Sequence, residues 1–296
     1  MTALKNFDGK KGSREPSAWL FKNLPGLLLG LLFSSGIGWL AYRRKALTRS
    51  GVLGAILSGT MTFGLGGWSW GLALIFFFTS SSLLSHWRKR EKEHTASDKF
   101  SKGTQRDFAQ ATANGGVATL LALGHTFAGS PALRSLLETG YIGALATANA
   151  DTWATELGVL SPCPPRLITT GAPVEPGTSG GVTPLGTAAG AAGALALGAF
   201  FRLLNPTRRA IPWLALIAGL IGSLVDSLLG ATIQAMYYCP LCARETERRI
   251  HSCGTRTRSL RGLAWLNNDV VNFLATLVGS VTAMLLSLLY ARRRTH

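Results

Sequence analysis

The chain has 296 residues, of which 47% are hydrophobic and only 15% are charged, and its formal net charge is +16. Soluble domains carry about 25% charged residues, so this composition excludes an ordinary soluble globular protein. A charge this basic would indicate nucleic-acid binding in a soluble chain. Its placement along the chain points to a membrane instead, and we expect no nucleic-acid partner.

Long apolar stretches recur along the chain at lengths near the ~20 residues that cross a bilayer. In chain order they are residues 24–42, 51–66, 68–86, 110–129, 183–204, 210–236 and 270–291. Residues 140–160 form a shorter, more polar stretch, which would cross a membrane only if neighbouring helices shielded it. We therefore predict an all-α fold, a polytopic helical membrane protein with about seven or eight transmembrane helices. Residues 1–22 form a polar N-terminal segment, and residues 23–296 form a single transmembrane domain with a cysteine-containing loop at 237–266.

Lysine and arginine are distributed unequally between the predicted loops. The alternate loops at residues 43–49, 86–109, 158–182 and 237–266 together hold 18 Lys and Arg, whereas the opposite connections hold 4. Because cytoplasmic loops carry the excess of positive charge, we expect these loops on the cytosol-like side of a multi-pass membrane protein. Both basic termini then fall on the other side. The membrane would be the endoplasmic reticulum or the plastid envelope in a eukaryote, and the plasma membrane in a bacterium.

Basic residues precede the stretch at 110–129. Lys102 and Arg106 stand at its head, and Asn114 follows inside it. Cationic groups that lead into a polar, glycine-containing helix entrance suit an anionic substrate at the membrane surface. Anchoring by the positive-inside rule explains the same charges, so both interpretations stay open.

Four carboxylates, Asp151, Glu156, Asp226 and Asp269, lie within or at the edge of apolar stretches. An ionisable group at such depth costs about 2.5 kcal/mol or more and usually faces a cavity, a partner or an ion. At helical spacing each lies on or beside a row of polar and small residues, so three helices present narrow polar stripes. We expect the stripes to converge on one interior pocket, whose polar lining includes Asn149, Thr152, Thr155, Ser223, Ser227, Asn268 and Asn272.

Convergent carboxylates with amide and hydroxyl oxygens suit a hard cation such as Mg²⁺. The alternative is hydrogen bonding between helices, a role that Ser, Thr and Asn have in membranes. That alternative explains the hydroxyl groups but explains four carboxylates badly. We therefore predict that Asp151, Glu156, Asp226 and Asp269 are catalytic residues and magnesium ligands.

A glycine-rich segment at residues 173–190 leads from a loop into the next apolar stretch. Gly180 and Gly181 permit tight turns, and Thr178 and Ser179 add hydroxyl groups near a helix start. Exposed amides at a helix N-terminus form a ready site for an anion. The sequence lacks the Gly-Lys-Ser/Thr ending of a Walker A loop. A plain glycine-rich turn, followed by small-residue packing, explains the segment equally well.

The loop at 237–266 contains Cys239, Cys242, His251 and Cys253. A Cys-x₂-Cys pair followed by His-x-Cys has the ligand types of a small structural zinc site, although the spacing is unusual. A disulfide or free thiols would account for the same residues, so zinc is one of three open interpretations.

Six short motifs occur in an order that is similar to one known group. They are "ANGGVAT", "ADTWATELGVLS", "PRLITT", "GTSGGVT", "GSLVDSLLGAT" and "LNNDVVNF". Over about residues 25–290 the chain resembles the integral membrane family called domain of unknown function 92. That family includes the plant phytyl-phosphate kinases of the tocopherol pathway and the eukaryotic transmembrane protein 19 group.

The resemblance implies an intramembrane kinase. Such an enzyme would transfer a phosphoryl group, with Mg²⁺, from a nucleoside triphosphate to a prenyl-type monophosphate such as phytyl phosphate. The related phytol and dolichol kinases suggest CTP as the donor. The partners would then be an isoprenoid lipid phosphate and the lipid bilayer. The alternatives are an ion-coupled or lipid-phosphate transporter and a membrane cytidylyltransferase, which would use the same phosphate and metal groups.

Overall fold

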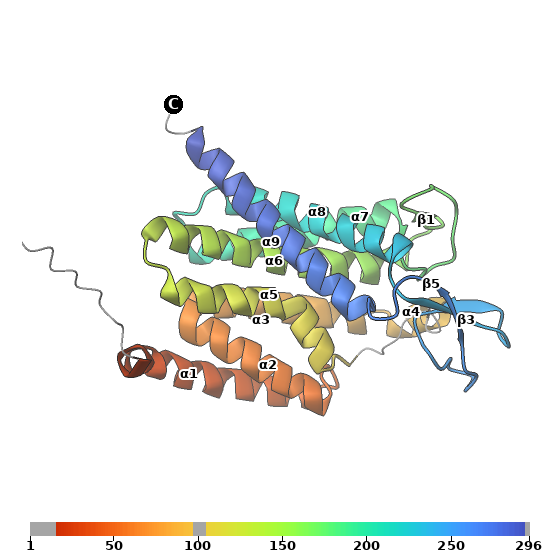
Figure 1. Ribbon diagram of the computed structural model, residues 1–296, viewed down its shortest axis with the longest axis horizontal. Coiled ribbons are helices and arrows are strands. Elements are labelled where there is room, and N and C mark those ends of the chain that lie inside the picture. Colours follow the sequence, from red (N-terminus) through yellow and green to blue (C-terminus); the bar gives the residue numbers. More distant parts are fainter. Residues whose placement is uncertain (1–15, 97–104, 294–296) are drawn as a thin grey trace, which may run out of the picture.

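The computed structural model describes residues 16–96 and 105–293, and these residues form nine α-helices (Figure 1). Helix α1 begins inside the segment predicted to be polar up to residue 22. The π-helical segment η1 (Thr62–Gly66) continues α2. The helices are α1 (Pro16–Arg43), α2 (Arg49–Met61), α3 (Trp68–His86), α4 (Lys89–Ala96), α5 (Phe108–Phe127), α6 (Pro131–Gly158), α7 (Pro184–Leu204), α8 (Ile211–Thr232) and α9 (Asn268–Arg292).

Five short strands lie outside the long helices, so the prediction of an all-α fold is wrong for the loops. β1 (Arg166–Leu167) pairs with β2 (Gly181–Val182), and the two are antiparallel. β3 (Met236–Cys239), β4 (Arg244–Thr246) and β5 (Arg258–Arg261) form an antiparallel sheet in the order β4-β3-β5. Strands of two to four residues are too short to show the alternation by which a strand is recognised. We call residues 236–261 the β-lobe.

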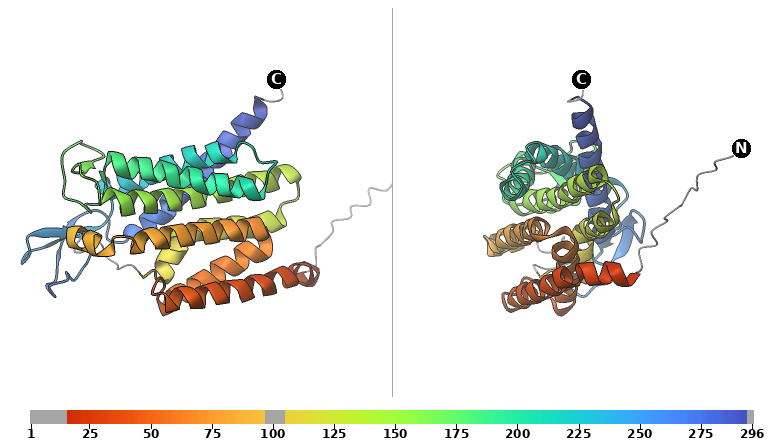
Figure 2. Two further views of the ribbon diagram at one scale, coloured as in Figure 1. Left: turned by 180° about the vertical axis from the view of Figure 1, so that it is seen from behind. Right: turned by 90° about the vertical axis from the view of Figure 1, so that its left-hand side faces the viewer.

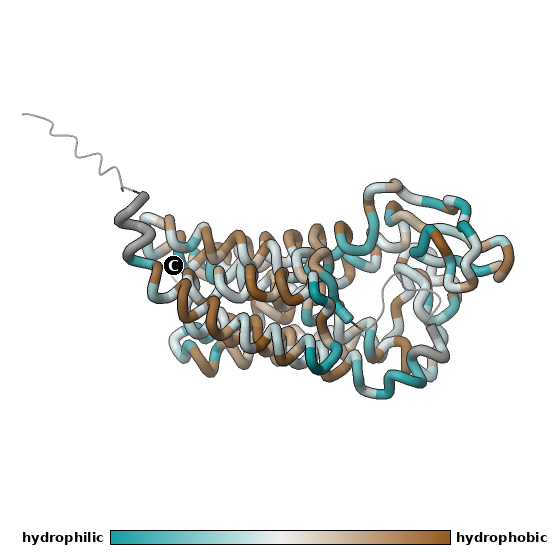
Figure 3. Tube along the Cα trace, turned by 90° about the horizontal axis from the view of Figure 1, so that it is seen from below, coloured by the Kyte–Doolittle hydropathy of each residue, from teal (hydrophilic) through white to brown (hydrophobic). Residues whose placement is uncertain are grey.

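Five of the described helices are long and apolar enough to cross a membrane, judged by length and composition. These segments are Lys22–Arg43, Trp68–His86, Pro184–Leu204, Ile211–Thr232 and Asn268–Arg292. Apolar residues follow the helical bundle, and polar residues gather at one end of it (Figure 3). The same end carries α4, β1 and the β-lobe, whereas the last turns of α9 lie at the opposite end (Figures 1 and 2). The predicted basic loops therefore share one end of the bundle.

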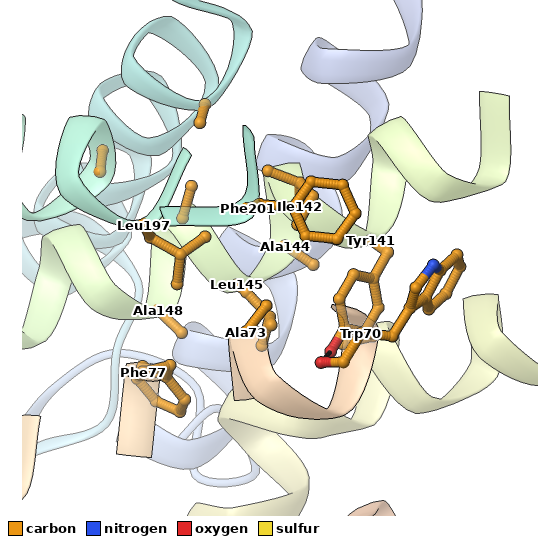
Figure 4. Packing of buried hydrophobic residues seen from close by; sticks show 14 of the residues in the cluster. Trp70, Ala73, Phe77, Tyr141, Ile142, Ala144, Leu145, Ala148, Leu197 and Phe201 are labelled. Carbon is orange, nitrogen blue, oxygen red and sulfur yellow. Dashed lines mark hydrogen bonds between the residues drawn. The ribbon is translucent and has the colours of Figure 1, made fainter. Parts of the chain in front are cut away.

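Helix α6 is the centre of the bundle. It packs against α5, α7, α8 and α9, and every residue from Thr139 to Ala150 is buried. Beside it, the Tyr141 hydroxyl donates to the Trp70 carbonyl at 2.6 Å, and the two rings lie 4.2 Å apart (Figure 4). Neighbouring helices therefore shield the stretch at 140–160, and such shielding is what this stretch would need in order to cross a membrane.

Glycines bring α8 and α9 into close contact with α6 at Thr147. A Cβ atom on Gly222 or on Gly279 would overlap the Thr147 side chain. The Thr147 hydroxyl donates to the Gly143 carbonyl at 2.9 Å and lies 3.3 Å from the Ala218 carbonyl. Small residues at helix interfaces and hydroxyl groups bonded across them are the usual means of helix association in membranes.

We expect Gly279→Val to destabilise the protein by about 1–3 kcal/mol, because a tightly packed interface has no room for added methyl groups. Thermal unfolding in detergent would measure the effect as a lower Tm. Gly36→Val is the matched control, since no atom lies within 4 Å of a Cβ at this exposed position of α1. Equal Tm values for the two variants would contradict the close packing.

Candidate functional site

A cavity of about 650 Å³ opens at the end of the bundle where the loops gather, and we call it the polar pocket. Its volume lies within the ~300–1,000 Å³ range of small-molecule sites. Helices α3–α9, the loop before β2 and the β-lobe all contribute to its wall. The predicted site residues that line it are Arg106, Asn114, Asp151, Thr152, Thr155, Glu156, Thr178, Ser179, Gly180, Gly181, Ser223, Asp226, Ser227, Asn268 and Asn272.

Charges of both signs line the polar pocket in equal number. The acidic side chains are Asp151, Glu156, Asp226 and Glu247, and the basic ones are Lys89, Lys92, Arg106 and Arg248. Asp151, Glu156 and Asp226 come from the membrane helices α6 and α8, whereas the cations come from α4, the loop before α5 and the β-lobe. A pocket of this composition presents anion-binding and cation-binding groups to one ligand.

Asp151 and Asp226 face each other from α6 and α8. Their charges interact, and the Glu247 charge acts on Asp226 as well. The Ser223 hydroxyl lies 3.5 Å from Asp151 Oδ1, at the limit of a hydrogen bond. Among the described residues, the buried Asp226 Oδ2 atom has no hydrogen-bond partner. Mutually repelling carboxylates with an unsatisfied buried oxygen fit a bound cation, because a cation would offset both costs.

Glu156 is held differently from the other two carboxylates. Its Oε2 forms an ion pair with Lys92, and its Oε1 accepts a hydrogen bond from the Ser85 hydroxyl at 2.5 Å. Lys92 also donates to the Leu84 carbonyl at 2.5 Å. The predicted set of four magnesium ligands therefore includes one carboxylate, Glu156, whose charge is already paired with a lysine of α4.

Arg106 enters the pocket from a loop whose backbone is fixed. Its amide donates to the Ala46 carbonyl, and its carbonyl accepts from the Thr48 amide, both at 3.0 Å. The guanidinium lies over the rings of Phe77 and Phe78 at 5.4 and 5.8 Å. Burial lowers the pKa of Arg106 to about 10, against the opposing effect of the Glu156 charge, so the group stays protonated at neutral pH. Lys102, which was predicted beside it, lies outside the described residues.

The glycine-rich loop passes close to the end of α8. Gly180 has a φ of +83°, and a Cβ on it would come within 2.6 Å of the Ala231 backbone, so only glycine fits. The Gly181 amide donates to the Thr178 carbonyl at 2.9 Å, which closes the turn. The Ser179 hydroxyl donates to Gln234 Oε1 at 3.2 Å. The predicted phosphate loop thus lies on the pocket wall, but its Gly181 amide and its Ser179 hydroxyl already have partners.

Two predicted site residues lie elsewhere. Asn149 is fully buried between helices, where it accepts from the Ser80 hydroxyl at 3.0 Å and donates to the Gly193 carbonyl at 2.8 Å. It joins α6 to α3 and α7, which is the packing role that the sequence left as the alternative. Asp269 is absent from the pocket lining, because Asn268 and Asn272 share a row of α9 that faces the pocket and Asp269 lies on the next row.

Sequence patterns did not single out four further charged residues of the pocket, which are Lys89, Lys92, Glu247 and Arg248. All four belong to polar segments outside the long apolar stretches, where charged residues are ordinary. Lys89 and Lys92 were visible only as part of the basic loop at 86–109, and Glu247 and Arg248 only as part of the cysteine-containing loop.

A second polar cluster lies within the β-lobe. The ligand atoms of Cys239, Cys242, His251 and Cys253 lie within 4.8 Å of one another, so this group could bind a metal ion. In the described part of the chain it is the only group of three or more His, Cys, Asp or Glu side chains gathered closely enough to do so. All four cysteines of the chain are free. The pocket carboxylates do not form such a cluster by themselves.

Comparison with known proteins finds similar chains in a plant and in an archaeon. It is 34% identical to protein PGR of Arabidopsis thaliana over 86% of this chain and 93% of that one. It is 30% identical to an uncharacterized membrane protein of Methanocaldococcus jannaschii, over 88% and 94%. Identity to the chloroplastic protein VTE6 of Arabidopsis thaliana is 26%, over 81% and 65%. No solved structure is significantly similar to the chain.

Residues 32–280 match the family described as integral membrane protein DUF92, the family that the sequence motifs resemble. The match covers the C-terminal part of α1, every helix from α2 to α8, the β-lobe and the first half of α9. The protein is thus a multi-pass integral membrane protein, and it belongs to the integral membrane protein DUF92 family.

Proposed function

We propose that this protein is a membrane kinase that transfers a phosphoryl group from a nucleoside triphosphate to a prenyl-type monophosphate. The observation that carries the proposal is that Asp151 and Asp226 line one pocket together with Arg106, and that Asp226 Oδ2 has no hydrogen-bond partner among the described residues. Phosphoryl transfer depends mainly on positioning and on neutralisation of phosphate charge. A phosphoryl-transfer site therefore needs carboxylates that bind a metal cation and basic side chains that bind phosphates.

Asp151 and Asp226 would hold Mg²⁺, which typically binds one or two protein carboxylates together with substrate phosphates and water. When bound, Mg²⁺ neutralises charge on the phosphate oxygens. The hydroxyl and amide groups of Ser227, Asn268 and Asn272 lie in the same wall and would orient the bound waters. In this arrangement the substrate supplies the remaining oxygens, so the described carboxylates need not form a complete set of ligands by themselves.

Arg106, Lys89 and Arg248 would bind the phosphates of donor and acceptor, since all three line the pocket. Gly180 and Thr178 would let the donor phosphates approach the backbone closely. An oxygen of the acceptor monophosphate forms the new bond to the γ-phosphorus, and the nucleoside diphosphate leaves. A phosphate monoester is already a nucleophile at neutral pH, so no general base is required. CTP is our proposed donor, on the resemblance to phytol and dolichol kinases.

An apolar crevice beside the polar pocket supports a lipid acceptor. The crevice, of about 80 Å³, lies between α1, α2, α3 and α5, and its wall includes Ile37, Ala55 and Ser58. It shares Arg106 and Asn114 with the polar pocket. A phosphate bound at Arg106 would thus place the first carbons of an isoprenoid tail in the crevice, with the remainder in the bilayer.

We also propose that α1, α2 with η1, α3, α5, α6, α7, α8 and α9 all cross the membrane. Segments α2, α5 and α6 are less apolar than the five long apolar helices, but they run beside them within the bundle. Eight crossings put both termini on the side opposite the basic loops. The polar pocket then opens on the cytosol-like side, where nucleotides are available.

Kinase activity would be measured with purified protein, phytyl, geranylgeranyl or farnesyl monophosphate, Mg²⁺ and labelled CTP, ATP, GTP or UTP. We expect lipid diphosphate as the product. Asp226→Asn and Asp151→Asn should each lower the rate by on the order of a hundredfold or more, because each removes charge from the cation site. Glu91→Gln, an exposed residue of α4, is the matched control.

The products of this assay separate the competing functions. Release of pyrophosphate with a nucleotide-linked lipid would make the protein a cytidylyltransferase. Exchange of lipid phosphate across liposomes without nucleotide consumption would make it a transporter. A fully active Asp226→Asn enzyme would exclude that residue from the cation site.

The Lys92–Glu156 pair is expected to be structural. Lys92→Met should destabilise the protein by up to about 3 kcal/mol, because it leaves the largely buried Glu156 without its counter-charge. The double variant Lys92→Met/Glu156→Gln should regain most of that loss. Unfolding in detergent for the wild type, both single variants and the double variant gives the coupling free energy, and additive effects would rule the coupling out.

Ser58→Phe should fill the apolar crevice and raise the KM for prenyl phosphates, because the tail loses its place. The KM for the nucleotide should not change. Thr79→Phe, at an exposed position of α3, is the control for added bulk. An equal rise in both KM values for Ser58→Phe would show that the crevice does not bind the lipid.

A further inference from the structure

The β-lobe is too small to be stable through burial of apolar side chains. Its buried residues are few, and they include the Thr246 and His251 side chains. Leu241 and Ile250 are 72% and 65% exposed, so much of its apolar surface faces outward. Units of fewer than about 40 residues are usually held by disulfides or metals. The β-lobe contains no disulfide, since its three cysteines are free.

The geometry of the cysteine cluster fits a tetrahedral metal ion. The sulfur atoms of Cys239 and Cys253 lie 3.7 Å apart, and His251 Nδ1 lies 3.2 Å from Cys253 Sγ. Zn–S bonds of about 2.3 Å in a tetrahedron place two sulfurs about 3.8 Å apart, whereas a disulfide needs about 2.05 Å. Cys242 completes a set of four ligands, all within 4.8 Å of one another.

The types of the four ligands and the charge around them favour zinc as the metal bound at this cluster. Three thiolates and one imidazole form a common tetrahedral structural site for Zn²⁺ and leave no open position for a substrate. The complex carries a net charge of −1, and the segment around it is rich in arginine, including Arg244, Arg249 and Arg256. His251 is 3% exposed, an unusual burial for an imidazole unless it has a partner of this kind.

Along the chain, two residues of the polar pocket lie between ligands of the cysteine cluster. Cys242 precedes and His251 follows Glu247 and Arg248, both of which line the pocket. Glu247 Oε1 accepts a hydrogen bond from the Gln234 amide at 2.9 Å, and Gln234 Oε1 accepts one from Ser179 at 3.2 Å. Fixing both ends of this short segment therefore fixes Glu247, and through Gln234 the glycine-rich loop.

We propose that Cys239, Cys242, His251 and Cys253 bind one Zn²⁺ ion, which folds the β-lobe and holds Glu247 and Arg248 in the wall of the polar pocket. The ion is structural and touches no substrate. The proposal does not rest on the kinase activity, because the ligands and the contacts that carry it are independent of the reaction.

Metal analysis of the purified protein tests the site. We expect about one zinc per chain, and a loss of zinc to background in Cys242→Ser and in Cys253→Ser. Cys163→Ser, which removes an exposed cysteine outside the β-lobe, should keep its zinc. Replacement of zinc by Co²⁺ in the wild type should give the visible absorption of a tetrahedral cobalt–thiolate centre, which does not depend on a variant that folds. Absence of zinc, iron in its place, or a disulfide among these cysteines would overturn the proposal.

Trypsin digestion of the wild-type protein tests the link to the pocket. Chelation of zinc should speed cleavage after Arg248 several-fold, and added Zn²⁺ should restore the original rate. Cleavage after Arg209, an exposed residue of the turn between α7 and α8 that does not line the pocket, should be the same in both states and is the internal control. Zinc that is removed without any change at Arg248 would show that the ion does not hold the pocket wall.

Discussion

The close approach of α8 and α9 to α6 is the constraint on which the rest of the structure depends. Gly222 and Gly279 allow the contact with Thr147. Because residues four apart lie on the same face of a helix, this contact also decides which residues meet one turn further along. Asp151 follows Thr147 by four residues, and Asp226 follows Gly222 by four. Because α6 and α8 touch at Thr147 and Gly222, the carboxylates of Asp151 and Asp226 face each other one helical turn further along. Packing therefore holds together two like charges that would otherwise separate.

The polar pocket lies where this packed bundle meets the loops, and that location explains its charges. Most of the acidic groups come from helices that are anchored by their apolar neighbours, whereas the cations come from water-facing segments. Lys92 reaches back to Glu156 and ties α4 to α6. Arg106 is fixed by its backbone contacts and lies over two aromatic rings. Rigid supports of this kind hold the charged side chains in fixed positions around the pocket.

The β-lobe connects the helix that carries Asp226 to the helix that carries Asn268 and Asn272. Its chain returns to α8 through hydrogen bonds, since Arg261 donates to the Gly230 carbonyl at 2.7 Å and the Leu263 amide donates to the Ile233 carbonyl at 3.0 Å. Gly262, with a φ of +84°, leaves no room for a side chain beside Gln234. The β-lobe is thus part of the wall of the pocket and not a free appendage, which is why it supplies Glu247 and Arg248.

The amino-acid sequence by itself determined the membrane class, the positions of the long helices, the family and many of the polar residues that line the pocket. These features follow from local patterns, because apolar length and the cost of buried carboxylates can be read without knowing the neighbours. Only the tertiary structure decided which polar residues are satisfied. Asn149 meets Ser80 and Gly193, and Glu156 meets Lys92. Asp269 is absent from the pocket lining, whereas Asp226 Oδ2 has no hydrogen-bond partner in the described part of the chain. The partner of a polar group usually comes from a distant segment, so its role is fixed by packing and not by spacing along the chain.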